Sequence, residues 1–259
     1  MIPRKIHYCW FGRKPLPAKA KKCIASWRRF LPDYEIIEWN EDNFDVNSTA
    51  YTREAYKAGK YAFVSDYARF AILSEQGGLY FDTDVEIIRD PEAIIAAGPF
   101  MGFELDAAKE YEAYDTDGFG QINCGLGMGA EPGMAMIDEI VERYRAAEFT
   151  PGTNIEKYNV VWHTTETLKR HGLKAEPGIQ HVGGFTLYPS EYFCPKDYAT
   201  NRLHITPKTI SIHHYEASWH TFSFRVRRRL RRYALKALGR NGADRLGRIF
   251  HSIAGPRKN

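Results

Sequence analysis

The apolar and polar positions at the start of the chain predict a strand, a helix and a second strand. An apolar run over residues 5–11 is typical of a buried strand. Glycine and proline interrupt it before a helical pattern over residues 17–30, and a second strand is predicted at 34–39. Two strands joined through a helix are the opening unit of a parallel sheet, so the pattern predicts an α/β fold.

The strongest helical pattern covers residues 59–76, where apolar side chains recur at intervals of three and four. The glycine pair 77–78 ends this helix, because glycine adopts the left-handed backbone that closes a helix. Residues 79–81 are apolar and predict a short buried strand, which Asp82 and Asp84 follow directly.

The remainder of the chain has weaker patterns. A helix is predicted over residues 133–147, and strands are predicted over 184–188 and 209–214. Residues 118–129 are rich in glycine, which predicts turns.

Charge separates a body from a tail. Residues 220–259 hold 12 Lys and Arg against the single acidic Asp244, which leaves 24 basic and 31 acidic side chains in residues 1–219. A chain of 259 residues has room for one substantial α/β domain. We therefore predict one α/β domain at 1–219 and a basic helical tail at 220–259, with different binding partners.

The tail predicts a basic amphipathic helix. Over residues 222–238 apolar side chains fall on one face and arginines elsewhere. Such helices lie on anionic lipid, so we expect a membrane surface to contact residues 222–251. A helix that docks on the body or stays solvated is the alternative. No nucleic acid is expected, because the arginines lack interleaved aromatics and a helix-turn-helix pattern.

Two features of the composition indicate the cellular compartment. The chain begins without the long apolar stretch of a signal peptide or membrane span, so we expect a cytoplasmic protein, peripheral on the inner face of the membrane. The four cysteines lie far apart and form no Cys-x-x-Cys pair, which favours free buried thiols over a zinc site or disulfides.

Asp82 and Asp84 stand two residues apart at the end of a predicted strand. In a strand such residues point to the same side, so two carboxylates should face one space. Open α/β sheets bind ligands at this end of their strands. A divalent cation relieves the repulsion between the carboxylates, and a bound diphosphate completes its shell. The pattern therefore indicates a metal site that stabilises a leaving diphosphate.

An Asp-x-Asp pair also occurs in other settings. It arises by chance in solvated turns, and phosphatases of the haloacid dehalogenase type place it at the end of a buried strand. Those enzymes normally carry the pair at the opening of the domain and need a downstream Gly-Asp-x-x-x-Asp element, which this sequence lacks. A phosphatase that uses Asp82 and a non-catalytic module that binds nucleotide or lipid are the alternatives.

Three segments, taken in order, resemble one known family. They are residues 2–12, residues 62–69 with the sequence Ala-Phe-Val-Ser-Asp-Tyr-Ala-Arg, and residues 77–84 with the sequence Gly-Gly-Leu-Tyr-Phe-Asp-Thr-Asp. Together they resemble the DXD sugar-binding region of glycosyltransferase family 32, which includes bacterial capsular-polysaccharide transferases and fungal Golgi mannosyltransferases. That family is distantly similar to the large clostridial glucosylating toxins. A weaker similarity covers residues 212–219.

The resemblance implies a GT-A fold, which is a Rossmann-like α/β fold with a mostly parallel central sheet that binds a nucleotide-sugar. It also implies a divalent metal, manganese or magnesium, and transfer of a hexose from a UDP- or GDP-sugar with retention of configuration. The implied acceptor is a glycan or a lipid-linked sugar, in capsular or surface polysaccharide synthesis.

Matching positions on the first strand and the strongest helix take donor-binding roles from the resemblance. Trp10 matches an aromatic residue that stacks on the nucleotide base, although a core tryptophan is the alternative. Asp66 and Arg69 lie three apart on one helix face, where they contact the donor's sugar and phosphate. An exposed ion pair is the alternative for these two, but their aromatic neighbours favour burial.

Near the end of the body the resemblance implies further ligands. His213 and His214 precede Ser218 and Trp219, and only one histidine can reach the site from a strand. We favour His214. Asn123 resembles a residue close to the transferred sugar, and a turn-forming asparagine is the alternative.

No catalytic base is assigned, because in this kind of retaining transfer the leaving phosphate deprotonates the acceptor. An inverting reaction would use Glu104 or Asp106. The predicted catalytic residues are Asp82, Asp84 and Asn123, the predicted metal ligands are Asp82, Asp84, His214 and Ser218, and the predicted donor-binding residues are His7, Trp10, Asp66, Arg69 and Trp219.

Overall fold

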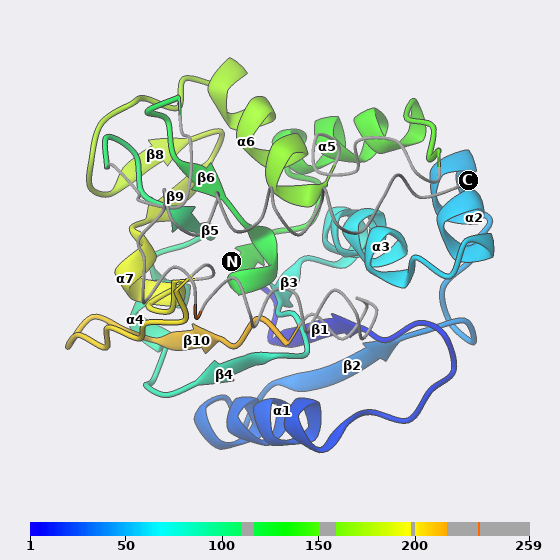
Figure 1. Ribbon diagram of the computed structural model, residues 1–259, viewed down its shortest axis with the longest axis horizontal. Helices are drawn as coiled ribbons and strands as arrows, with labels where there is room; N and C mark the ends of the chain where they lie inside the picture. The colour runs from blue at the N-terminus through cyan, green and yellow to red at the C-terminus, as the bar shows by residue number, and fades with distance from the viewer. Residues whose placement is uncertain (110–116, 151–158, 198–199, 217–232, 234–259) are drawn as a thin grey trace.

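The structure is a computed structural model that describes residues 1–109, 117–150, 159–197, 200–216 and 233 (Figure 1). The strands are β1 (Lys5–Cys9), β2 (Glu35–Trp39), β3 (Gly78–Tyr80), β4 (Val85–Ile87), β5 (Phe100–Leu105), β6 (Gln121–Ile122), β7 (Met128–Ala130), β8 (Gln180–Val182), β9 (Phe185–Tyr188) and β10 (Ser211–His213). The helices are α1 (Ala18–Phe30), α2 (Ala50–Lys57), α3 (Tyr61–Gln76), α4 (Glu92–Ala96), α5 (Ala135–Arg145), α6 (Val160–Arg170), α7 (Ser190–Phe193) and the 3₁₀ helix η1 (Cys124–Leu126).

The described strands form one large sheet and one two-stranded sheet. The order in the large sheet is β2-β1-β3-β7-β5-β9-β8, and β6 also pairs with β5. The pairing directions mean that β2, β1, β3, β5 and β9 run one way and β6, β7 and β8 run the other way. The α/β class and the mostly parallel central sheet predicted from the sequence are therefore confirmed.

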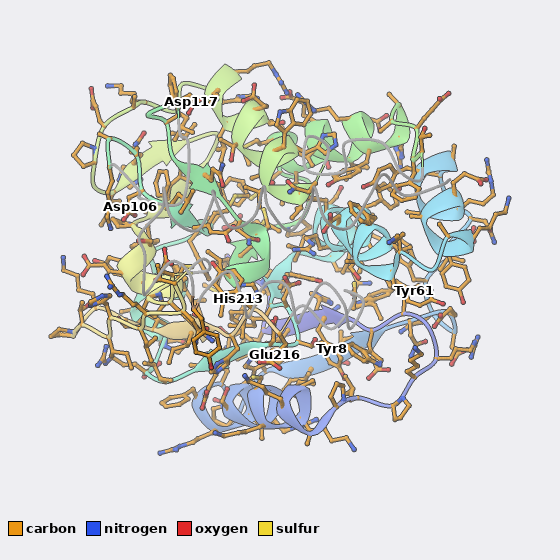
Figure 2. All side chains as sticks on the ribbon, viewed as in Figure 1. Tyr8, Tyr61, Asp106, Asp117, His213 and Glu216 are labelled. Atoms are coloured by element: carbon orange, nitrogen blue, oxygen red, sulfur yellow. The ribbon has the colours of Figure 1, made fainter. Side chains whose placement is uncertain are left out.

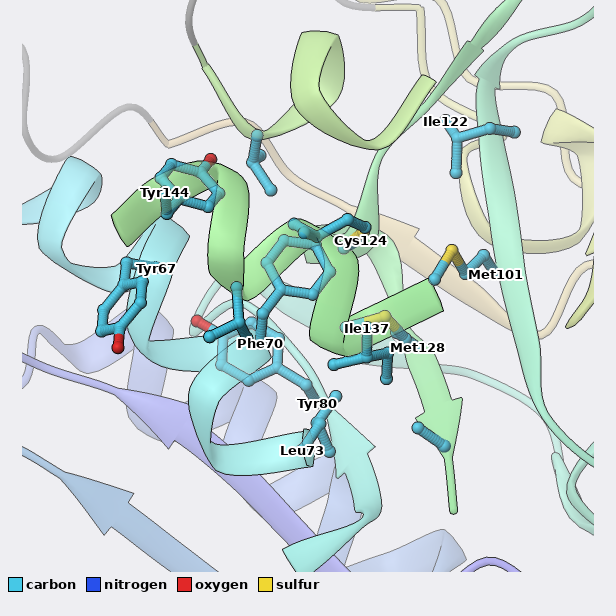
Figure 3. Close-up of a cluster of buried hydrophobic side chains, with 14 of the residues drawn as sticks. Tyr67, Phe70, Leu73, Tyr80, Met101, Ile122, Cys124, Met128, Ile137 and Tyr144 are labelled. Carbon is cyan, nitrogen blue, oxygen red and sulfur yellow. The ribbon is translucent and has the colours of Figure 1, made fainter. Parts of the chain in front are cut away.

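Helices cover the two faces of the sheet. In Figure 1, α3, α5 and α6 lie on one side, and α1 lies on the opposite side beside β4. Successive side chains of a central strand point to opposite faces of the sheet, so each strand packs against helices on both sides. Ile6 and Tyr8 of β1 pack in the same apolar cluster as Trp27 of α1, whereas Cys9 packs in the cluster that contains α3. Figure 3 shows the second cluster, in which α3, α5 and β3 contribute neighbouring side chains.

The junction between α3 and β3 depends on two glycines with positive φ. Gly77 has φ 60° and its N–H donates to Leu73 O, as the predicted helix end requires. A Cβ on Gly78 would lie 2.9 Å from Lys5 O. A side chain there would push β3 away from β1, so the glycine keeps the two central strands adjacent.

The two-stranded sheet joins distant parts of the chain. Strand β10 runs antiparallel to β4, and His213 is paired with Val85. Because Val85 directly follows Asp84, this register brings the end of the described body to the aspartate pair.

The four cysteines are buried free thiols, as predicted. Within the described residues, no helix combines the length and the apolar character needed to cross a bilayer. The predicted amphipathic tail helix lies outside the described residues, apart from Tyr233.

Candidate metal and donor site

Asp82 and Asp84 lie in the turn between β3 and β4. Val85 N donates to Asp82 O at 3.0 Å, so the chain already turns at the first aspartate. The two carboxylates therefore do not leave one face of a strand, contrary to the prediction from their spacing. The turn nevertheless brings both carboxylates into one cluster at the carboxyl end of β3.

His213 completes this cluster. One ligand atom from each of Asp82, Asp84 and His213 lies within 4.8 Å of the others. His213 Nε2 is 3.1 Å from Asp84 Oδ1, while His214 Nε2 lies 2.7 Å from Glu86 Oε2. Because neighbouring side chains of a strand alternate, the β4–β10 register directs His213 to the aspartates in place of the expected His214.

The pKa values of Asp84 and His213 shift in opposite directions. Burial alone would raise the pKa of Asp84, but the charge and hydrogen bond of His213 and the N–H of Glu216 hold it well below its usual range. Burial would likewise lower the pKa of His213, but the charge and hydrogen bond of Asp84 outweigh it and raise the pKa. The cluster thus attracts positive charge.

Asp84 is enclosed by consecutive residues that follow β10. Its Oδ2 accepts from Glu216 N at 2.8 Å, and its backbone carbonyl accepts from His214 N at 2.9 Å. Figure 2 shows His213 and Glu216 close together near the end of β10. The Glu216 N–H thus holds one oxygen of this carboxylate while His213 contacts the other.

The Asp82 carboxylate is contacted by Arg69 of helix α3 and by Tyr80 of strand β3. Arg69 Nη2 lies 3.0 Å from Asp66 Oδ1 and 3.4 Å from Asp82 Oδ1, and Tyr80 Oη donates to the same Asp82 oxygen at 3.3 Å. The Arg69 Cζ atom is 4.7 Å from the centroid of the Tyr80 ring. Arg69 therefore ties α3 to the aspartate turn.

Asp66 and Arg69 are both buried, at 7% and 3% exposure, so the exposed ion pair is excluded. Burial raises the pKa of Asp66 to about 6, because the opposing charge of Arg69 compensates only in part and Asp82 adds to the rise. Arg69 Nη1 is buried and has no hydrogen-bond partner among the described residues. A buried guanidinium with an unused donor is suited to an anionic ligand.

Gly125 is a site residue that our sequence analysis did not single out. A Cβ at this position would lie 2.0 Å from Asp82 Oδ2, and Gly125 O accepts from Asp82 N at 3.0 Å. Asn123 Oδ1 in turn accepts from Gly125 N at 2.8 Å, so the asparagine shapes this turn. The sequence signal was the glycine-rich run 118–129, which does not show which glycine faces the carboxylates.

Glu104 and Asp106 are both engaged by protein donors. Glu104 accepts from Asn123 Nδ2 at 3.0 Å and from Tyr215 Oη at 2.8 Å. Asp106 accepts from the N–H and hydroxyl of Ser190 at 2.6 and 2.7 Å. These contacts give both carboxylates structural roles in this conformation.

Trp10 and His7 of the first strand have different surroundings. Trp10 is half-buried beside a hollow of ≈ 390 Å³ at the carboxyl ends of β1 and β2, which Glu38, Asn40 and Glu41 also line. His7 is fully buried, with Nδ1 3.0 Å from Trp39 Nε1 and Nε2 3.0 Å from Gly77 O. Both ring nitrogens of His7 form hydrogen bonds within the protein, so neither is free to contact a nucleotide-sugar.

Ser218 and Trp219 lie outside the described residues. Among the described residues, the set suited to a cation is Asp82, Asp84 and His213. Carboxylate oxygens and an imidazole nitrogen suit a divalent ion such as manganese, and ligands of one ion lie about 4–5 Å apart at most. The 4.8 Å spread of this cluster is compatible with a shared ion.

Comparison with known proteins identifies the region around the aspartates. Residues 17–101, about a third of the chain, match the family model described as "Glycosyltransferase sugar-binding region containing DXD motif". A curated relative is the subversion of eukaryotic traffic protein A of Legionella pneumophila strain Philadelphia 1, which is 26% identical over 111 residues. The match covers 32% of this chain and 17% of that protein.

Three solved structures resemble the fold. The PaToxG glycosyltransferase has a TM-score of 0.46 and 16% identity, and the match covers 65% of this chain and 69% of that one. The galactosyltransferase LgtC in complex with donor and acceptor sugar analogues has a TM-score of 0.44 and 16% identity, with 84% of this chain and 90% of that one covered. A glycosyltransferase involved in glycosylation of the major capsid of PBCV-1 has a TM-score of 0.43 and 9% identity, with 83% of this chain and 95% of that one covered.

Both aspartates and the Asp66–Arg69 pair fall inside the matched residues, whereas His213 lies outside them. The segment that carries Asp82 and Asp84 thus matches a glycosyltransferase sugar-binding region with a DXD motif.

Proposed function

We propose that this chain is a metal-dependent retaining glycosyltransferase that transfers a hexose from a UDP- or GDP-sugar. The observation that carries the proposal is the convergence of Asp82, Asp84 and His213 at the carboxyl end of β3, within and beside the matched sugar-binding region. Such a location is where open α/β sheets bind nucleotides.

Asp82, Asp84 and His213 would hold the divalent ion, which we propose to be manganese. When bound, the ion would neutralise the charge that develops on the leaving diphosphate. Arg69 fixes Asp82 through its 3.4 Å contact and keeps its unpaired Nη1 close to Gly125, so it is suited to a donor phosphate or sugar oxygen. In this proposal Asp66 orients Arg69 and binds a sugar hydroxyl.

We place the nucleotide base at Trp10. The hollow beside this residue adjoins the end of β1, and β1 pairs with β3, whose end bears the aspartates. A base on Trp10 and a diphosphate at the aspartates would thus occupy the same edge of the sheet. Asn123 and Trp219 complete the proposed set of residues around the donor sugar.

The acceptor side rests on the family resemblance and the charge of the tail. We propose a glycan or lipid-linked acceptor in surface-polysaccharide synthesis, and deprotonation of that acceptor by the leaving phosphate. The basic residues of 222–251 suit an anionic membrane surface, which would place the enzyme at the cytoplasmic face of a membrane.

Release of nucleoside diphosphate from a panel of UDP- and GDP-sugars tests the proposal. With Mn²⁺, the wild type should release diphosphate from one donor, Asp84→Asn should not, and the control Glu86→Gln should retain activity because Glu86 contacts His214 instead of the cluster. Hydrolysis of simple phosphoesters with magnesium alone would instead support a phosphatase acting through Asp82. Nucleotide binding without release would indicate a non-catalytic module.

A further inference from the structure

Tyr215 has a backbone conformation that a residue with a side chain rarely adopts. Its φ is 55°, in the left-handed region, and the residue is only 9% exposed. A bulky residue keeps such a conformation only when its surroundings hold it there. Strained residues of this kind concentrate at functional sites.

The left-handed turn wraps the chain around Asp84. Before the turn, His213 Nε2 contacts Asp84 Oδ1 at 3.1 Å. After it, Glu216 N donates to the other carboxylate oxygen at 2.8 Å. An extended residue at position 215 would carry the peptide of Glu216 away from Asp84, so the Glu216 contact depends on the turn.

The side chain of Tyr215 is anchored to the half-buried carboxylate of Glu104. Its hydroxyl donates to Glu104 Oε1 at 2.8 Å and also lies 2.8 Å from Cys194 Sγ. Its ring packs on the ring of His213 with a centroid separation of 4.3 Å. The hydrogen bond to Glu104 therefore fixes the position of Tyr215, and the Tyr215 ring in turn restricts the orientation of the His213 imidazole.

Glu104 also reaches the other aspartate. Its Oε2 accepts from Asn123 Nδ2 at 3.0 Å, and Asn123 Oδ1 accepts from Gly125 N at 2.8 Å. Gly125 O then accepts from Asp82 N at 3.0 Å. One carboxylate, on β5, thus links the turn that encloses Asp84 to the loop that packs against Asp82.

We propose that Tyr215 and Glu104 are positioning residues for the metal site. Tyr215, anchored on Glu104, holds His213 and the Glu216 amide on Asp84, and Glu104 acts on Asp82 through Asn123. The inference rests on the proposed function only in that the positioned groups bind a cation. Groups that orient metal ligands in this way usually change metal affinity when they are removed.

Two variants break the anchor with little change of shape. Tyr215→Phe removes the hydroxyl and keeps the ring, and Glu104→Gln keeps the size of the side chain while one of its two acceptor positions becomes a donor. Tyr188→Phe is the matched control, because Tyr188 is also buried, at 8% exposure, in the same apolar cluster as Tyr215.

Two readouts besides activity test the inference. Amide hydrogen exchange at Glu216 should accelerate in Tyr215→Phe and Glu104→Gln, while urea unfolding shows that the whole fold has not opened. Manganese affinity, measured by titration of the EPR signal of free Mn²⁺, should fall roughly 10-fold or more in both variants. Tyr188→Phe should match the wild type in both measurements.

Unchanged exchange at Glu216 in Tyr215→Phe would overturn the inference, and so would wild-type manganese affinity in that variant. If the wild type bound no manganese while exchange at Glu216 still accelerated in both variants, the proposed function would fail and the positioning role of Tyr215 would stand.

Discussion

Replacing Gly125 by alanine should displace Asp82 without straining the backbone. Gly125 does not have a positive φ, so alanine is compatible with its conformation. The new Cβ would lie 2.0 Å from Asp82 Oδ2 and 2.7 Å from its Cγ, whereas ordinary contact begins at 3.4 Å. The carboxylate must therefore retreat by about 1.4 Å, and the Cβ would also lie only 3.1 Å from Arg69 Nη1.

A shift of this size at a metal-binding carboxylate should lower kcat/KM about 100-fold, which is about 2.7 kcal/mol of transition-state stabilisation. Donor turnover measured over a range of Mn²⁺ concentrations gives the effect, and manganese affinity should fall with it. Gly129→Ala is the control, because its Cβ would meet the Phe100 ring at 2.4 Å in the apolar core. That variant should lose thermal stability and keep its manganese affinity. Wild-type turnover in Gly125→Ala would refute the placement of Asp82 at the reacting centre.

Three further predictions concern pH and the tail. Manganese affinity should weaken as pH falls from 8 to 6, because the neighbouring carboxylates raise the pKa of His213 and a proton then competes with the metal; a pH-independent EPR titration would contradict this. The free energy of unfolding should decrease as pH falls from about 6.5 to 4. Burial lowers the pKa of His7 and of His163 to about 4 in the folded protein. Below pH 6.5 the unfolded chain therefore binds protons at these histidines that the folded protein does not bind. The loss is at most about 3 kcal/mol for each histidine, and urea unfolding of His163→Gln should show a correspondingly weaker pH dependence. The full chain should float with anionic liposomes and a chain of residues 1–219 should not; equal flotation of both would exclude membrane binding by the tail.

The periodicity of the first ninety residues predicted most of their elements, although helix α2 (Ala50–Lys57) and strand β4 (Val85–Ile87) were missed. The predicted strand at 5–11 and helix at 17–30 correspond to β1 (Lys5–Cys9) and α1 (Ala18–Phe30), and the predicted helix at 59–76 corresponds to α3 (Tyr61–Gln76). These segments combine a clear period with glycine or proline at their ends, so local sequence and tertiary packing favour the same structure.

Later elements were missed because their sequences carry weaker local signals. Strand β6 has two residues and β7 has three, and their pairing with β5 and β3 decides their conformation. Helix α6 begins at an Asn159 cap directly after residues 151–158, which the structure does not describe. Tertiary pairing of this kind cannot be obtained from periodicity.

In the candidate site, too, some residues could be predicted from a sequence motif, whereas others required the three-dimensional structure. Asp82 and Asp84 were predictable because a motif marks them, and their proximity to Arg69 followed from neighbouring elements. The choice between His213 and His214 required the register of β10 on β4, and the proximity of Gly125 to Asp82 required the path of a glycine-rich loop. Such long-range geometry depends on the packing of the whole domain.

The central claim is that Asp82, Asp84 and His213 together hold the cation that serves the donor. Pulsed EPR of the Mn²⁺-loaded protein measures it directly, because a coordinated imidazole produces a ¹⁴N coupling to the manganese. We expect this coupling in the wild type and in His214→Ala, and its loss in His213→Ala. A wild type without nitrogen coupling, or a coupling that survives in His213→Ala, would contradict it.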